Sequence, residues 1–186
     1  MKKCLIYIYL LLLTSLCCLQ AGAVSSEIRS LSVSDGLPDL VINTIYKDSK
    51  GYVWMGTNTS VERFDGIRLE HYMVEGSNEN LKRVFALVEM PGNELWVGTG
   101  MGLFRLADDA EKLERLAPEM ITSGVHAFCK LGDVLYVGTE KGLYVYKGGV
   151  FEHVLVDKNI FSRANFVTGM VEGENGILWL STMGGL

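Results

Sequence analysis

The sequence predicts an all-β protein, a β-propeller with about three complete four-stranded blades and an incomplete fourth. A short cassette of an aromatic residue, a variable residue, Gly and Thr recurs along the chain, with aromatic positions 42, 40 and 43 residues apart. A period near 40 residues is the length of one four-stranded blade. The 21 glycines are spread evenly through the chain, which indicates frequent turns. Radially stacked sheets would bury the strand faces and leave only short edges exposed.

The cassette itself is expected to be structural, because residues that repeat in every blade build the scaffold. Its aromatic residue supplies a large apolar face, and its Gly lets a neighbouring backbone approach closely. Its Thr suits a strand end, where the hydroxyl can bond locally. The fourth copy has Ser181 in place of Gly. The structural repeat residues are Trp54, Gly56, Thr57, Trp96, Gly98, Thr99, Tyr136, Gly138, Thr139, Trp179 and Thr182.

The segments around each cassette complete the expected blade. An apolar segment of five or six residues precedes each cassette, and its β-branched and aromatic residues favour a strand. A turn rich in Asp, Asn, Pro and Gly joins the two strands, because hairpin turns need positive φ. A second turn leads to a third strand, and a fourth, more polar strand follows. Residues 107–120 could form a helix by composition, but they fall where an outer strand is due, so strand or loop is predicted there.

The chain is predicted to divide into a signal peptide and one repeat domain. Lys2 and Lys3 precede an apolar run that is shorter than the roughly 20 residues of a membrane-spanning helix, and Ala21-Gly22-Ala23 resembles a signal peptidase site. Cleavage of residues 1–23 is expected, with an uncleaved anchor as the alternative. The predicted partial propeller spans residues 24–186, with blades at about 31–75, 76–120, 121–158 and an incomplete 159–186.

Charge and composition exclude several classes of function. The formal net charge is −5 and becomes more negative once Lys2 and Lys3 are removed with the signal. No basic cluster is present, which argues against binding to nucleic acid or to an anionic membrane surface. Only Cys129 lies beyond the signal, so no internal disulfide is expected, and its apolar neighbours favour a buried core residue.

No catalytic or metal-binding motif stands out in the sequence. His71, His126 and His153 have no metal-ligand spacing, and no Gly-rich phosphate loop or nucleophile elbow is present. Carboxylates are numerous, but most lie in turns where they satisfy backbone donors, and no residue unique to one blade suggests catalysis. We therefore expect no catalytic residue, no metal and no cofactor.

The motifs of the first copy resemble the two-component regulator propeller repeat. They are Leu31-Ser32-Val33-Ser34-Asp35-Gly36-Leu37-Pro38, the segment from Asp48 to Thr57, and Arg63-Phe64-Asp65-Gly66. The resemblance extends from about Ser30 to Leu186, although the later copies lack the Asp-Gly-Leu-Pro lead-in.

The resemblance implies an exported, periplasmic sensor portion of a hybrid two-component histidine kinase, which in this family is typically anchored in the inner membrane and controls polysaccharide use. No kinase or output module is recognised in the chain, so it is not expected to be an enzyme or to signal as it stands. Propellers close with about 4–8 blades, which predicts an open edge that pairs with further repeats or another chain. Membrane contact is expected only through the signal segment or the parent protein, and a truncated or frameshifted gene product is one interpretation.

The expected ligand is an oligosaccharide, bound where the loops between blades meet the turns between second and third strands. The polar, non-repeating residues of these loops suit hydrogen bonding to sugar hydroxyls. A propeller hydrolase, lyase or quinoprotein, and an inactive structural fragment, are the alternatives. The candidate ligand-binding residues are Asn58, Arg83, Glu140, Lys141 and Asn165.

Overall fold

The computed structural model describes residues 28, 30–74 and 81–185, and Ser32–Leu186 forms one compact unit. The export signal predicted for residues 1–23 lies outside these described residues. Regular structure in the described part of the chain consists of β-strands and short 3-10 helices. No described helix has the length and apolar character needed to cross a membrane.

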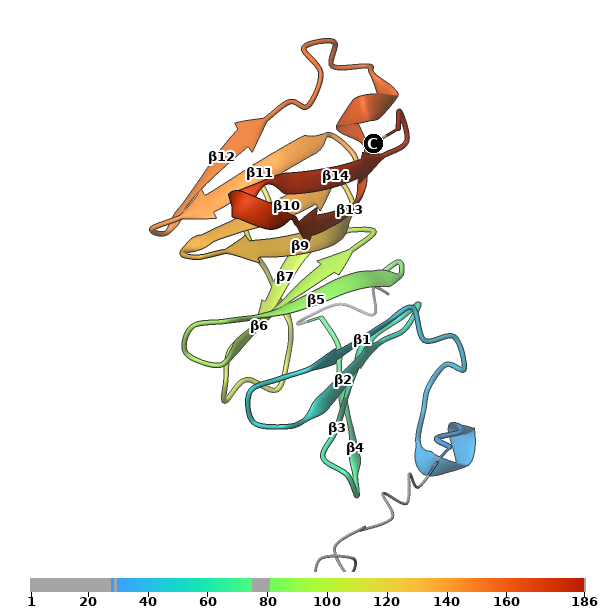
Figure 1. Cartoon of the computed structure of the whole chain (residues 1–186). Coiled ribbons are helices and arrows are strands. Elements are labelled where there is room, and N and C mark those ends of the chain that lie inside the picture. Colours follow the sequence, from blue (N-terminus) through green and yellow to red (C-terminus); the bar gives the residue numbers. More distant parts are fainter. Residues whose placement is uncertain (1–27, 29, 75–80, 186) are drawn as a thin grey trace, which may run out of the picture. The chain divides into compact units, whose positions relative to one another are not determined.

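The strands form three four-stranded antiparallel sheets and one two-stranded sheet, each in chain order (Figure 1). This arrangement confirms the predicted partial propeller. The first sheet contains β1 (Thr44–Lys47), β2 (Val53–Gly56), β3 (Val61–Phe64) and β4 (Leu69–Tyr72). The second contains β5 (Val84–Met90), β6 (Glu94–Thr99), β7 (Gly102–Leu106) and β8 (Glu114–Arg115). The third contains β9 (Val125–Leu131), β10 (Val134–Thr139), β11 (Gly142–Lys147) and β12 (Val150–Val154), and the fourth β13 (Val167–Glu172) and β14 (Leu178–Thr182).

Short 3-10 helices and loops complete the described chain. The helices are η2 (Val33–Asp35), η3 (Arg163–Asn165) and η4 (Glu174–Gly176). Residues 107–120 contain only the short strand β8, so the prediction of strand or loop there is confirmed.

The cassette threonine closes the turn that follows the second strand of each sheet. Its hydroxyl donates to the carbonyl oxygen three residues later, at 3.1 Å in the first sheet and at 3.0, 2.8 and 2.8 Å in the next three. The accepting residue is a glycine with positive φ in the later copies, a conformation that glycine adopts without strain. Ser60 takes this position in the first sheet.

The cassette glycine is the docking point for the next sheet. A Cβ on Gly56 would lie 2.5 Å from Val84 Cγ1, and one on Gly98 would lie 2.8 Å from Val125 Cγ1. Gly138 and Val167 repeat this contact at 2.7 Å. All three valines are fully buried. The sheets therefore stack by inserting a β-branched side chain of one inner strand (β5, β9 and β13) against the bare backbone of the preceding cassette.

Two hydrophobic clusters lie between neighbouring sheets. The cluster between the first and second sheets includes Trp54, Val97 and Phe104. The cluster between the second and third sheets includes Trp96 and Val137. Burial of these faces is the main force that holds the stack together. The later cassette aromatics are more accessible: Tyr136 is half-buried and Trp179 is exposed.

Candidate functional site

A β-bulge near the start of the inner strand re-aims one side chain in each of the second and third sheets. The pairing register shifts between Val84 and Ala86 in β5, which leaves Phe85 as the extra residue. In β9 the same shift makes His126 the extra residue. Bulges commonly turn side chains toward functional surfaces. Asn43 is the equivalent residue before β1, where its backbone N–H donates to Gly56 at 2.8 Å.

Hydrogen bonds link polar side chains of the first sheet to residues 81–83, which lead into β5 of the second sheet. We call residues 81–83 the connector. Asp39 Oδ2 accepts a bond of 2.9 Å from Asn58 Nδ2. Asn58 Oδ1 accepts a bond of 3.1 Å from Asn43 Nδ2, and Asn43 Oδ1 accepts one of 3.0 Å from Arg83 Nε. Backbone N–H bonds, above all that of Val41, keep the pKa of Asp39 below its usual range, so this carboxylate is charged at neutral pH.

Aromatic rings continue the same series into the third and fourth sheets. The Arg83 guanidinium lies 5.3 Å from the centre of the Phe85 ring. The Phe85 and His126 rings are 4.1 Å apart, and His126 and Phe166 are 4.9 Å apart. His126 Nε2 also lies 3.3 Å from Glu140 Oε1. We refer to these connected side chains as the polar–aromatic row: Asp39, Asn43, Asn58, Arg83, Phe85, His126, Glu140 and Phe166.

The connector that carries Arg83 has a strained backbone. Lys82 and Arg83 both have positive φ, 49° and 75°, which is uncommon for residues with a side chain. Arg83 N–H donates to the Asn58 carbonyl at 2.8 Å, and its own carbonyl accepts from Gly100 N–H at 3.0 Å. Such strain persists only where the surroundings enforce it, and it is concentrated at functional sites.

The structure brings three of the five predicted ligand residues into the row: Asn58, Arg83 and Glu140. Lys141 is exposed beside Glu140, and its Nζ is 3.4 Å from Thr122 Oγ1. Asn165 precedes Phe166 of the row, but it is only 1% exposed and its side chain is not a member of the row. Its side-chain amide holds a loop, with bonds of 3.0 and 2.9 Å to the carbonyls of Asp157 and Asn159.

The sequence reasoning did not select the other members of the row. Phe85, His126 and Asn43 lie inside predicted inner strands, where a strict alternation would place them on a sheet face. The sequence does contain a pattern that points to Phe85 and His126: the valine before the bulge repeats (Val84, Val125), while the next residue changes from blade to blade. A residue that varies within a repeated strand is a candidate for a specific role.

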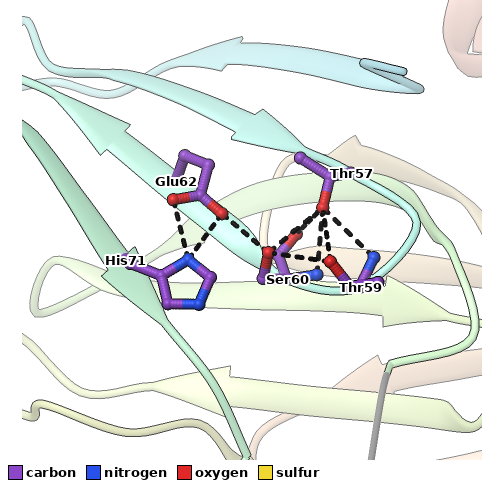
Figure 2. A network of polar contacts seen from close by, with 5 residues as sticks. All are labelled: Thr57, Thr59, Ser60, Glu62 and His71. Carbon is purple, nitrogen blue, oxygen red and sulfur yellow. Dashed lines mark hydrogen bonds and ion pairs between the residues drawn. The ribbon is translucent and has the colours of Figure 1, made fainter. Parts of the chain in front are cut away.

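The first sheet also contains a polar network that the sequence reasoning missed (Figure 2). Glu62 is fully buried, and its Oε1 accepts a bond of 2.7 Å from Ser60 Oγ. His71 Nδ1 lies 2.9 and 3.0 Å from the two carboxylate oxygens. Burial raises the pKa of Glu62, while the bonds from Ser60 and His71 oppose this effect.

The signal for this network was also in the sequence. By strand register, Glu62 stands where the later sheets have Phe104 and Tyr144, and Ser60 stands where they have glycine. Glu62 and Ser60 are therefore residues that set the first sheet apart from the second and third.

The two seams between complete sheets differ in openness. The first seam, between the first and second sheets, leaves a space of only about 20 Å³ beside Trp54 and Leu106. The second seam, between the second and third sheets, holds a cleft of about 610 Å³ lined by residues that include Trp96, Tyr146 and Phe151. A volume of this size suits a small ligand.

The row combines the groups that bind an uncharged polar molecule. Arg83 and Asn58 offer donors, Asp39 and Glu140 offer acceptors, and Phe85 and Phe166 are half-buried rings. Among the described residues, no group of three or more His, Cys, Asp or Glu side chains is arranged to hold a metal ion.

Comparison with known proteins supports the repeat type. Residues 36–59 match the family model described as "Two component regulator propeller". The resemblance expected from the sequence is confirmed. This segment contains the first cassette and Asn58. Among curated proteins, none matches the chain significantly.

Solved structures share the fold at low identity. The extracellular domain of a hybrid two component system from B. thetaiotaomicron is similar with a TM-score of 0.64 and 22% identity, over 76% of this chain and 19% of that one. A streptogramin B lyase has a TM-score of 0.58 and 15% identity, over 78% of this chain and 49% of its own. The computationally designed Ika4 protein has a TM-score of 0.54 and 14% identity, over 78% and 88%. The chain thus spans about a fifth of the length of the two-component structure, and the likeness concerns the fold.

Proposed function

We propose that this chain is the exported, ligand-sensing propeller portion of a two-component signalling regulator, and that it acts by binding and not by catalysis. The observation that carries the proposal is the polar–aromatic row, which joins side chains from four successive sheets. The match of residues 36–59 to the two-component regulator propeller supports the signalling role. The extracellular location of the similar domain from B. thetaiotaomicron supports export to the periplasm.

The proposed ligand is an oligosaccharide. Sugar rings present C–H groups that pack on aromatic faces, and hydroxyls that both donate and accept hydrogen bonds. The row supplies Phe85 and Phe166 for the first kind of contact and Arg83, Asn58 and Glu140 for the second. Because the row crosses several sheets, a bound ligand would favour one relative arrangement of them. Such a bias is how binding could be passed to a signalling partner.

Binding of a panel of neutral and acidic oligosaccharides, measured by titration calorimetry, tests this function. For an oligosaccharide that binds, Arg83→Ala should weaken the affinity by about tenfold or more, because a charged hydrogen bond is removed. The matched control is Arg68→Ala, since Arg68 is an exposed arginine in the turn between β3 and β4 and is not in the row. Equal loss in both variants, or binding unaffected by Arg83→Ala, would argue against the row as the site.

A further inference from the structure

Each four-stranded sheet supports the turn after its second strand with a side chain from its fourth strand. In the second sheet, Arg115 Nη2 donates to the Met101 carbonyl at 2.8 Å. In the third, His153 Nε2 lies 2.8 Å from the Lys141 carbonyl. The register places His71 at the same position of the first sheet. The ring of His71 contacts the carboxylate of Glu62, so the first sheet supports its turn through an intermediate side chain.

This support is a relay of three side chains that ends on the turn. His71 bonds Glu62, Glu62 accepts from Ser60 Oγ, and Ser60 Oγ lies 3.1 Å from Thr57 Oγ1 (Figure 2). Thr57 Oγ1 in turn accepts from the backbone N–H of Thr59 at 3.1 Å and of Ser60 at 3.0 Å. We call Ser60, Glu62 and His71 the relay.

The turn supported by the relay holds the strained connector of the polar–aromatic row. The carbonyls of Thr57, Asn58 and Thr59 accept three of the backbone bonds that fix this connector. Their donors are the N–H groups of Val84 at 2.8 Å, Arg83 at 2.8 Å and Leu81 at 3.3 Å. A path of direct contacts therefore runs from His71, whose side chain is 42% exposed, to Arg83.

Glu62 has few groups that can compensate its charge. Arg63 and Glu70 are the nearest charged residues on β3 and β4, and they pair with each other on the other face of the sheet, where Arg63 lies over Tyr72. β2 places uncharged Met55 opposite Glu62. Among the described residues, the groups that bond the Glu62 carboxylate are Ser60 and His71. A buried carboxylate costs stability unless it is paired and hydrogen-bonded, so its presence in place of an aromatic residue needs a reason.

We propose that the relay is a proton-sensitive support for the connector, so that ligand affinity at the row changes with the protonation of Glu62. The effect on affinity rests on the proposed function, whereas the effect on the connector does not. Glu62 and His71 are positioning residues, since they act through the Thr57–Ser60 turn. When Glu62 takes up a proton in acid, it accepts hydrogen bonds less strongly from Ser60 and His71, and the turn becomes less well held.

Local and global stability respond to acid in opposite directions. Because burial raises the pKa of Glu62 in the folded protein, the folded state binds this proton more tightly than the unfolded chain. Glu62 therefore makes the free energy of unfolding rise as the pH falls through its pKa. The connector, in contrast, is expected to loosen. A merely structural role for Glu62 would produce the first effect without the second.

Amide hydrogen exchange of the purified protein, followed by NMR at about pH 8 and about pH 5, tests the proposal. The protection factors of Arg83 and Val84, which are corrected for intrinsic exchange, should fall by about tenfold in acid. In Glu62→Gln this acid-induced fall in protection should disappear, because the glutamine amide can still accept a hydrogen bond from Ser60 but does not titrate. The control is His153→Gln, which should leave the connector unchanged.

Two outcomes would overturn the proposal: connector protection that does not change with pH, or an unchanged response in Glu62→Gln. If that variant does not fold, His71→Gln tests the same relay from its exposed end. The exchange measurement needs no ligand. A panel without a binding oligosaccharide would therefore count against the proposed function alone, while a rigid connector in acid would count against the relay alone.

Discussion

The first and second seams have equivalent walls, yet one is filled and the other is a cleft. In the first seam Lys50 pairs with Asp108 across the opening, and Asn93 adds a bond of 3.1 Å to Asp108. In the second seam, the strand registers place Gly92 at the position equivalent to Lys50 and Gly148 at the position equivalent to Asp108. The second seam therefore has no equivalent of this ion pair at these two positions. The two charged turn residues thus close the first seam and are missing from the second.

The arginine on the third strand behaves differently in the two seams. Arg63 lies over the rings of Tyr52 at 4.7 Å, Trp54 at 5.6 Å and Tyr72 at 5.7 Å. Arg105 is its equivalent, but Glu94 replaces the first tyrosine. Arg105 pairs with Glu114 at 3.1 Å, as Arg63 pairs with Glu70, but it also approaches Glu94 at 3.9 Å. The Arg63 side chain, beside three rings, is 24% exposed, whereas the Arg105 side chain, beside Glu94, is 42% exposed.

The largest expected effect on the free energy of unfolding is at the cassette glycines Gly56 and Gly98, where neighbouring sheets are in close contact in both seams. Gly98→Ala would place a Cβ 2.9 Å from the Val125 carbonyl oxygen, whereas the three atoms nearest a Cβ on Gly56 belong to the side chains of Val84 and Thr44. Backbone cannot yield easily, so we expect Gly98→Ala to lower the free energy of unfolding by about 3 kcal/mol and Gly56→Ala by about 2 kcal/mol. Urea unfolding measures both. Equal costs would show that the two docking points are equally adaptable.

A smaller effect is expected at the arginines. Arg63→Ala removes a guanidinium stacked on three rings and should cost about 2 kcal/mol in the free energy of unfolding. Arg105→Ala should cost less than about 1 kcal/mol, because its partners are exposed carboxylates. Chemical denaturation of the two variants side by side gives the difference. A larger cost for Arg105→Ala would mean that the cleft depends on this residue for its shape.

The smallest effect is expected for the Lys50–Asp108 pair, whose side chains are 41% and 38% exposed. The bond from Lys50 lowers the pKa of Asp108, and the bond to Asp108 raises the pKa of Lys50. Their mutual stabilisation is therefore present at neutral pH, is lost as acid protonates Asp108, and is lost again as alkali deprotonates Lys50. A double-mutant cycle with Lys50→Ala and Asp108→Ala, read from melting temperatures, should give a small coupling that shrinks in high salt. Coupling that persists in acid would contradict this description.

The repeat made most of the fold predictable. The cassette spacing fixed the number of sheets, and the hydrogen bonds of Thr99 and Thr139 and the close approach at Gly98 follow from simple properties of those residue types. The site was less accessible, because it depends on how different blades face one another. A bulge in β5 and another in β9 bring Phe85 and His126 into the row, and strand alternation alone does not reveal a bulge.

The same limit explains Asn165 and Glu62. Asn165 was chosen as a polar loop residue, but the carbonyls that its amide binds come from six and eight residues away in a loop whose path depends on packing. Glu62 lies in the predicted third strand, where its charge alone gives no sign of burial. Its burial becomes visible only when the third strands are aligned by register, against Phe104 and Tyr144.

The contact between a cassette glycine and the valine of the next sheet also affects how such a chain can evolve. Each sheet carries the recess on its second strand and the matching side chain on its first, as the second sheet does with Gly98 and Val84. A duplicated sheet therefore arrives with both halves of its joint and fits between any two existing sheets. Variation can then accumulate in the turns and bulges of single copies. The joint makes the number of copies easy to change and leaves the chemistry of each copy free to diverge.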